Sequence, residues 1–406
     1  FRIGMATVSG WGASRVGMRL GLKPVELIKE ALTRALKKAS IHETQLDALL
    51  ACPSLSDPKF MEAHHIATAC NLFGHSERRP FVAKTVDVGG ASPVSMLLQA
   101  KHMVENEGYS TVAIVGGDAV SSLPSKEFLN RADDAFAPKE VREKISFLNS
   151  PYIPNAYAHC SAAHMQTYAV TREQLAMVPV LMSAQAMYHP RAIQRLPYSL
   201  NDILTSAEIG PNLNLLECAR KADGAAAILV SKNGKIKVEG GAEASGPVLV
   251  EQDYNSTISR ISSARHAFQK AYESCHLTVE DIQFFGLYDC FPICFLRAVE
   301  AAGLVSEGQG GNWIEQKYRV WTDCLSQSKR LPVKEFPVNT HGGLLSFGAP
   351  WEVPAFFSLI EAFEQLSSTA TEGGRQIPNC HRAIVYGNGG VFNSSAVVIL
   401  SSGHSH

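Results

Sequence analysis

The apolar positions of the chain follow two spacings that alternate along it. Short runs rich in Val, Ile and Ala, such as residues 111–115, have the character of buried β-strands. Longer stretches, such as residues 23–36, place apolar side chains at positions i, i+3 and i+4, with Pro24 near the first turn of the helix that this spacing indicates. The alternation of strands with amphipathic helices predicts a parallel α/β architecture.

Two sections of the chain repeat one order of strand, glycine-containing turn and helix. The first contains a helix at 23–36, strands at 46–51 and 82–88, a helix at 93–107 and a strand at 111–115 that we expect Gly116 and Gly117 to end. The second contains a helix at 262–273, a strand at 282–287, an extended segment at 337–339, a helix at 352–365 and a strand at 383–386. Because this period is far too long for a solenoid, we expect a duplicated domain.

A segment rich in Pro, His and Met separates the two sections. Long insertions of this kind usually cover a site, although a purely structural subdomain is the alternative. We therefore predict an N-terminal half at 1–119 that a return strand at 220–232 completes, an inserted loop domain at 120–219, and a C-terminal half at 233–406.

Composition narrows the classes of function. The 37 Lys and Arg residues balance 38 Asp and Glu residues among 406, so no charge excess indicates nucleic acid as a partner. No run approaches the ~18 apolar residues of a membrane span. Nine cysteines without a CxxC pair favour free thiols over disulfides or a metal site. No phosphate-binding loop or dinucleotide fingerprint is present, so we expect no bound cofactor. Because the sequence starts with Phe1, we expect that a leader has been removed or left out.

Several local motifs carry a family resemblance. Residues 86–97 (VDVGGASPVSML) resemble the strand–turn–helix in which a thiolase holds its reactive cysteine, and Gly90 occupies the cysteine position. Further similarities follow in order: 164–176 resembles an HM-x-x-Y-x-x-T-x-E-x-x-A helix, 188–192 stands where an Asn-Pro is usual, 221–227 resembles a DGAAA turn and return strand, and 288–291 (YDCF) resembles a His-Asp-Cys-Phe loop.

Over nearly its whole length, the chain is thus similar to the sterol-carrier-protein-type branch of the thiolase superfamily. The Tyr-Asp-Cys-Phe loop resembles that of trypanosomatid thiolase-like proteins. The resemblance implies an α/β fold of two βαβαβαββ halves that form a five-layered α-β-α-β-α body, with an inserted loop domain. It also implies a homodimer that pairs through the strand at 82–88, and the isologous contact of such a dimer is the commonest symmetry.

The resemblance also implies an oxyanion hole built from backbone amides. One amide belongs to Gly90 and the other to Asn388, while Tyr386 stands at the position of the family's second cysteine. Main-chain donors at a helix N-terminus favour negative charge and survive a change of side chain. The alternative is that these glycine-rich turns are only tight turns.

A second set of implied site residues lies in the C-terminal half. Tyr288 replaces a histidine of the family's other oxyanion hole and can still donate one hydrogen bond. Ala349 replaces the second histidine, and His341 is either its substitute or a structural histidine. Cys290 would transfer protons, unless it only packs in the core, and Asp289 would orient the loop.

The missing nucleophile decides the expected chemistry. Thiolysis and Claisen condensation need an acyl-enzyme, and Gly90 cannot form one. Reactions that only generate a thioester enolate remain open, and weak decarboxylation of malonyl-CoA is the simplest. The alternatives are a non-catalytic acyl-CoA-binding or scaffold protein, and a retro-aldol lyase that uses tyrosines and works with a partner subunit.

The expected ligands and setting follow from the same resemblance. The expected substrate is malonyl-CoA, acetoacetyl-CoA or another acyl-CoA, with CoA held against 120–219 as part of the substrate. The expected setting is lipid metabolism, including sterol biosynthesis, in the mitochondrion.

Overall fold

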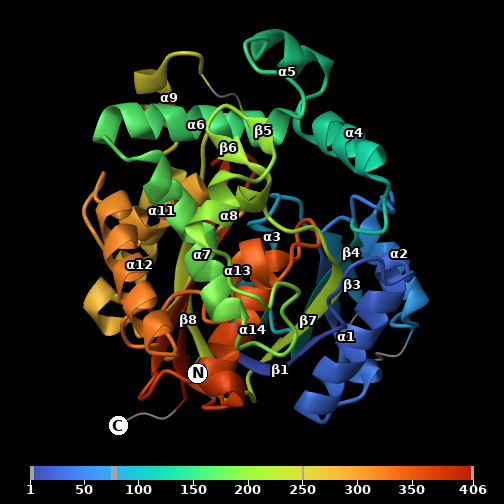
Figure 1. The fold of residues 1–406 in the computed structure, drawn as a ribbon. Coiled ribbons are helices and arrows are strands. Elements are labelled where there is room, and N and C mark those ends of the chain that lie inside the picture. Colours follow the sequence, from blue (N-terminus) through green and yellow to red (C-terminus); the bar gives the residue numbers. More distant parts are fainter. Residues whose placement is uncertain (1–3, 75–79, 249–250, 404–406) are drawn as a thin grey trace.

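The structure is a computed structural model that describes residues 4–74, 80–248 and 251–403. Its central feature is a nine-stranded mixed sheet with the order β3-β2-β4-β7-β1-β8-β11-β10-β9 (Figure 1). The strands of this sheet are β1 (Thr7–Ala13), β2 (Ala48–Ala51), β3 (Val82–Thr85), β4 (Thr111–Ala119), β7 (Asp223–Ser231), β8 (Ile236–Ser245), β9 (Phe284–Gly286), β10 (Arg382–Gly389) and β11 (Ser394–Ser402).

The two halves of the sheet have the same strand order on either side of the β1–β8 junction. Outward from β1 lie β7, β4, β2 and β3, and outward from β8 lie β11, β10 and β9. The outermost place in the second half is held by a single parallel bridge between Val338 and Phe285, so the extended segment expected at 337–339 is reduced to one bridge. This correspondence is the duplication that the sequence predicts.

The helices of the body form layers on and between the two halves of the sheet. They are α1 (Pro24–Ala39), α2 (Glu62–Ala69), α3 (Ser92–Asn106), α10 (Ser263–Cys275), α11 (Pro292–Ala301), α12 (Gly310–Ser326), α13 (Gly343–Ser346) and α14 (Pro354–Leu366). Helix α1 packs on β1 and β7, whereas α10 packs on β8 and β11. Helices α3 and α14 contact each other and strands from both halves, so they form the middle layer.

The packing of α1 shows how the sequence pattern produces these layers. Leu27, Ile28 and Leu32 lie on one face of the helix and are buried, and Pro24 occupies its first turn. Burying such side chains stabilises the fold by about 1.5–3 kcal/mol each. The helix predicted from this spacing is therefore confirmed.

The inserted segment is mainly helical. It contains α4 (Ser125–Phe136), α5 (Lys139–Lys144), α6 (Tyr152–Tyr168), α7 (Arg172–Ala186), α8 (Leu200–Leu204) and a small hairpin of β5 (Glu208–Gly210) and β6 (Leu213–Asn214). Helices α4, α5 and α6 lie together at one end of the molecule, at the top of Figure 1. After the segment, β7 inserts between β4 and β1. Helix α9 (Tyr254–Arg260), from the C-terminal section, packs against α6.

Two local predictions are wrong. Gly116 and Gly117 do not end β4, which continues to Ala119. A Cβ on Gly116 would lie 2.5 Å from the sulfur of Cys52, so this glycine permits close packing rather than a turn. The helix expected at 164–176 is broken: α6 ends at Tyr168, and the side chain of Thr171 caps the start of α7.

No helix within the described residues is both long enough and apolar enough to cross a bilayer.

Candidate functional site

A cavity of about 390 Å³ lies between the inserted segment and the body of the protein. Most of the side chains around it are apolar, and many come from α4, α6 and the β5–β6 region. Lys221 is the only basic side chain among the described residues that line it, and its ammonium lies 4.5 Å from the ring centroid of Phe128. Such a cavity suits a ligand with a large apolar part and an anionic end.

The floor of the cavity is formed where the glycine turns of the two halves meet. A Cβ on Gly89 would lie 2.9 Å from the Cα of Gly389, and a Cβ on Gly389 would lie 1.9 Å from the carbonyl oxygen of Val88. Only glycine lets the two backbones approach so closely. As a result Gly90 and Asn388, from opposite halves, both line the cavity. The use of their amides as an oxyanion hole stays a prediction.

Tyr288 fills the space that a side chain at position 90 would need. A Cβ built on Gly90 would lie 2.0 Å from the hydroxyl oxygen of Tyr288 and 2.4 Å from its Cζ. The ring is 6% exposed and lines the cavity. Burial raises the pKa of the phenol well above its ordinary value, so it is neutral at physiological pH and able to donate a hydrogen bond. A hydrogen-bond donor thus lies beside position 90, where the sequence resemblance would place a reactive cysteine.

Asn388 is held by its own hydrogen bonds, whereas Tyr386 lies behind the cavity wall. The Nδ2 of Asn388 donates to the hydroxyl of Tyr157 at 2.8 Å, and the hydroxyl of Tyr386 donates to Oδ1 of Asn388 at 3.1 Å. Tyr386 is buried against Phe268 and does not line the cavity. The side chain of Tyr386 therefore positions Asn388 rather than meeting a ligand.

Cys290 and Asp289 are neighbours in sequence but lie in different surroundings. Cys290 lines the cavity, and its carbonyl oxygen accepts a hydrogen bond from the amide of Ala219 at 2.9 Å. Asp289 is fully buried away from the cavity and accepts hydrogen bonds from the amides of Leu344 at 2.7 Å and Leu345 at 3.3 Å. Burial raises the pKa of Asp289 to about 7. This geometry ties the 288–291 loop to α13.

The structure does not bring His341 to the cavity. Its buried ring packs against Phe347, at a centroid distance of 5.4 Å, and borders a separate space of about 10 Å³. Burial lowers its pKa to about 4, so it is neutral. This placement does not support the prediction that His341 replaces the lost histidine.

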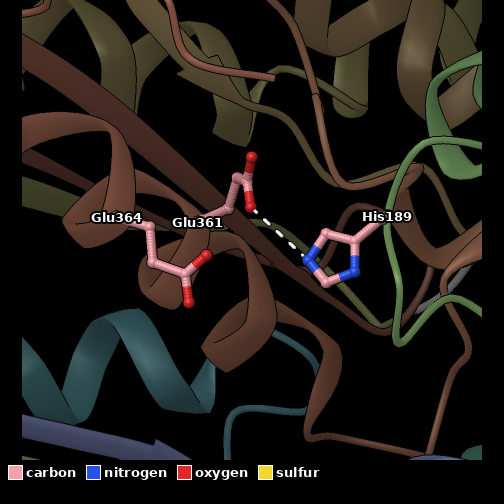
Figure 2. Close-up of side chains that lie close together, drawn as sticks. All are labelled: His189, Glu361 and Glu364. Atoms are coloured by element: carbon pink, nitrogen blue, oxygen red, sulfur yellow. Dashed lines mark ion pairs between the residues drawn. The ribbon is translucent and has the colours of Figure 1, made fainter. Parts of the chain in front are cut away.

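Three side chains near His341 approach one another in the manner of metal ligands. Figure 2 shows His189 directed at Glu361, with Glu364 beside it. However, the guanidinium of Arg375 pairs with both carboxylates, and that of Arg191 lies 3.2 Å from Glu364. Burial lowers the pKa of His189 to about 2, so its 3.8 Å contact with Glu361 involves a neutral ring. Two guanidinium groups therefore already balance the charge of these two carboxylates.

Glu352 is a cavity residue that the sequence analysis missed. The hydroxyl of Ser92 donates to its Oε2 at 2.9 Å, and burial together with the charge of Asp87 raises its pKa well above the ordinary value. It lies three residues beyond Ala349, the position at which the resemblance replaces the second histidine. The signal for it was an acidic residue in an otherwise apolar stretch.

The sequence of the chain is similar to those of several known proteins. A family model described as "Thiolase C-terminal domain-like" matches residues 250–402. An acetyl-CoA acetyltransferase of Methanothermobacter thermautotrophicus is 28% identical over 389 residues, which cover 93% of this chain and 94% of the relative. Sterol carrier protein 2 of Bos taurus is 25% identical over 265 residues, which cover 63% of this chain and 46% of the relative, so the match spans less than half of that protein.

Solved structures share the fold. An Ltp2–ChsH2 (DUF35) aldolase superposes with a TM-score of 0.78 at 21% identity, over 99% of both chains. A monomeric SCP2-thiolase-like protein type 1 from Mycobacterium smegmatis gives 0.71 at 16% identity, over 99% of this chain and 78% of that one. The Acat5 thiolase of Ascaris suum in complex with coenzyme A gives 0.67 at 13% identity, over 98% and 100%.

The predicted α/β thiolase fold is thereby confirmed, while the trypanosomatid subgroup stays a prediction. In sequence, the chain is thus similar to thiolases over most of its length and to sterol carrier protein 2 over 63% of it, and its C-terminal part matches the thiolase model.

Proposed function

We propose that the chain binds a CoA thioester in this cavity and generates its enolate without an acyl-enzyme, with slow decarboxylation of malonyl-CoA as the simplest reaction. One observation carries the proposal: the hydroxyl of Tyr288 lies 2.0 Å from the place where a side chain at Gly90 would begin. A hydrogen-bond donor therefore occupies the position from which a thiolase nucleophile would attack.

The chemistry follows from the charge that develops. Loss of carbon dioxide leaves negative charge on the thioester oxygen, and a preorganised donor stabilises such charge by about 3–4 kcal/mol. Tyr288 supplies one donor, and the predicted amide donors of Gly90 and Asn388 would supply others. Because its pKa is raised by burial, the Tyr288 phenol keeps its proton at neutral pH.

The cavity also suits the two ends of such a substrate. Apolar side chains of the inserted segment, including Phe128 and Leu129, face an acyl chain or the pantetheine arm. Lys221 provides a positive charge for a phosphate group. Coenzyme A is bound in the crystal structure of the Ascaris suum thiolase, which has the same fold.

The test is turnover of malonyl-CoA by the purified protein, followed as carbon dioxide and acetyl-CoA. We expect slow product formation, and a Tyr288→Phe variant should lose about 10²-fold in kcat with little change in binding. Tyr272→Phe is the matched control, because that phenol donates to the carbonyl of Ala302 and does not line the cavity. A folded wild-type protein that releases no product would overturn the catalytic proposal.

A retro-aldol reaction is the second candidate, and one observation favours it. Cleavage of the bond between Cα and Cβ of a β-hydroxyacyl-CoA leaves the same enolate, which the Tyr288 phenol would stabilise in the same way. The structural neighbour with the TM-score of 0.78 is an aldolase of two named components. Incubation of a β-hydroxyacyl-CoA with the protein alone, and with the protein co-purified from its source, tests this candidate. Cleavage only in the second sample would support a lyase that needs a partner.

A scaffold that binds acyl-CoA without turnover is the remaining alternative. Calorimetry that detects malonyl-CoA binding, together with no product from either substrate, would support this alternative over both enzymes.

A homodimer is proposed through β3. This strand lies at one edge of the nine-stranded sheet, and edge strands offer unpaired backbone groups to a second chain. Light scattering should then give about twice the chain mass of 44.0 kDa. A mass of one chain, as in the neighbour described as monomeric, would contradict this proposal.

A further inference from the structure

Glu352 places a carboxyl group on the wall of the cavity. The residue lies just before α14, is 6% exposed, and lines the cavity together with Gly90, Tyr288 and Asn388. A buried acidic side chain is costly unless it is paired or neutral. No basic side chain hydrogen-bonds or ion-pairs with it among the described residues.

A hydrogen bond fixes the carboxyl beside the glycine turn. The hydroxyl of Ser92 donates to Oε2 of Glu352 at 2.9 Å and accepts a hydrogen bond from the amide of Val88 at 3.0 Å. Ser92 therefore links Glu352 to the turn that contains Gly90. Within the described part of the chain, no hydrogen bond to Oε1 is found, and because Glu352 lines the cavity, a ligand there can bond to this carboxyl.

The surroundings of Glu352 favour its neutral, protonated form. Burial is the largest cause, the carboxylates of Asp87 and Asp118 raise its pKa further, and the hydrogen bond from Ser92 lowers it only in part. The other titratable groups that interact with it are the thiol of Cys52 and the phenol of Tyr288, both of which are also held neutral by burial. The neutral acids of the cavity thus include the phenol of Tyr288 and the carboxylic acid of Glu352.

We propose that Glu352 protonates the α-carbon of the thioester enolate, while Tyr288 stabilises its oxygen. The proposal rests on the enolate-forming function above. In malonyl-CoA, the bond between the α-carbon and the carboxylate breaks, carbon dioxide leaves, and the bonding electrons form the enolate. The O–H bond of Glu352 then breaks, a C–H bond forms at the α-carbon, and acetyl-CoA results. The carboxylate regains its proton from water.

The test uses the stereochemistry of protonation, which a structural role would not affect. Methylmalonyl-CoA decarboxylated in D₂O gives propionyl-CoA that carries deuterium at a new stereocentre. A fixed acid delivers the deuteron to one face, whereas solvent delivers it to both. We expect the wild-type product to be mainly one enantiomer, and the product of Glu352→Gln to be close to racemic while carbon dioxide is still released.

The controls separate the possible failures. Glu62→Gln makes the same change at a similarly buried carboxyl, 5% exposed, that does not line the cavity, and it should leave the enantiomeric excess unchanged. If Glu352→Gln does not fold, Glu352→Asp keeps an acid but withdraws it, and the excess should fall. An unchanged excess in the folded variant overturns the role of Glu352.

Two results with the wild-type protein complete the test. If it turns over with a racemic product, the role of Glu352 is refuted and the proposed function stands. If it releases no carbon dioxide at all, the proposed function fails and the role of Glu352 fails with it.

Discussion

Placing a methyl group at position 90 tests the contact on which the proposed site depends. In a Gly90→Ala variant, the new Cβ would lie 2.0 Å from the hydroxyl oxygen of Tyr288 and 2.5 Å from the carbonyl oxygen of Asn388. The phenol can move, but the carbonyl belongs to a paired strand of the sheet. The φ angle of Gly90 is not in the left-handed region, so these contacts, and not backbone strain, determine the effect.

The expected change in the free energy of unfolding is the sum of two opposing contributions. Replacing glycine by alanine at a compatible site stabilises a protein by about 0.4–1 kcal/mol, because the unfolded chain loses freedom. Overpacking a well-filled interior costs about 1–3 kcal/mol. Since both overlaps are severe, we expect the cost of overpacking to exceed the gain. The variant should then lose about 1–2 kcal/mol of stability.

A double-mutant cycle in urea unfolding measures how much of the loss is due to Tyr288. In a Tyr288→Ala background, the Gly90→Ala change should cost at least about 1 kcal/mol less, and the carbonyl of Asn388 accounts for the remainder. Gly4→Ala is the control, because its Cβ would meet only the flexible side chain of Lys232, at 3.1 Å. Effects that add within about 0.5 kcal/mol would refute the proposed contact between positions 90 and 288.

Three further predictions concern buried charges. Arg375→Met should destabilise the protein by about 3–5 kcal/mol because it leaves Glu361 buried without its partner, whereas Arg319→Met, at an exposed pair, should change the unfolding free energy by less than about 1 kcal/mol. Burial lowers the pKa of His341 to about 4, so on acidification the unfolded chain binds this proton before the folded chain does. The free energy of unfolding should therefore fall by up to about 3 kcal/mol between pH 6.5 and 4. A His341→Gln variant should show a shallower fall in Tm over this range. Burial raises the pKa of Asp289 to about 7. The stability that its proton contributes is therefore fully present below about pH 4 and is lost as the pH rises through 7. In an Asp289→Asn variant, Tm should no longer show this decline.

For these three predictions, equal losses in the two arginine variants, or pH profiles that match the wild type in the other two, would contradict the reasoning.

Much of the fold could be predicted from the sequence because it depends on local spacing. The apolar stripe of α1 and the strand–turn–helix around Gly90 are repeated patterns with known periods. The predicted end of a strand was wrong where glycines allow close packing between elements. Gly116 and Gly117 lie inside β4 because side chains from β7, α1 and α14 leave no room for a Cβ, and those neighbours are distant in sequence.

The site was only partly predictable for the same reason. The structure places four residues that the motif resemblance singled out, Gly90, Tyr288, Cys290 and Asn388, beside one cavity, and their roles there stay a prediction. The resemblance could not show that the Tyr288 hydroxyl lies in the space left at Gly90, nor that His341 points into a different cluster, because both facts depend on side-chain direction.

Glu352 was missed for a further reason. Its importance comes from burial and from the hydrogen bond to Ser92, a residue 260 positions away in sequence, rather than from a motif.

The presence of a phenol, and not a thiol, beside position 90 also affects sensitivity to reagents that modify cysteine. Peroxides and alkylating reagents inactivate enzymes that depend on an exposed thiolate, because they convert its sulfur to an inert form. At position 90 this chain has no sulfur to convert, and the oxygen of Tyr288 that takes its place is neutral and buried. During oxidative stress, position 90 would therefore offer no sulfur to oxidise, whereas an enzyme that depends on a cysteine there would be inactivated.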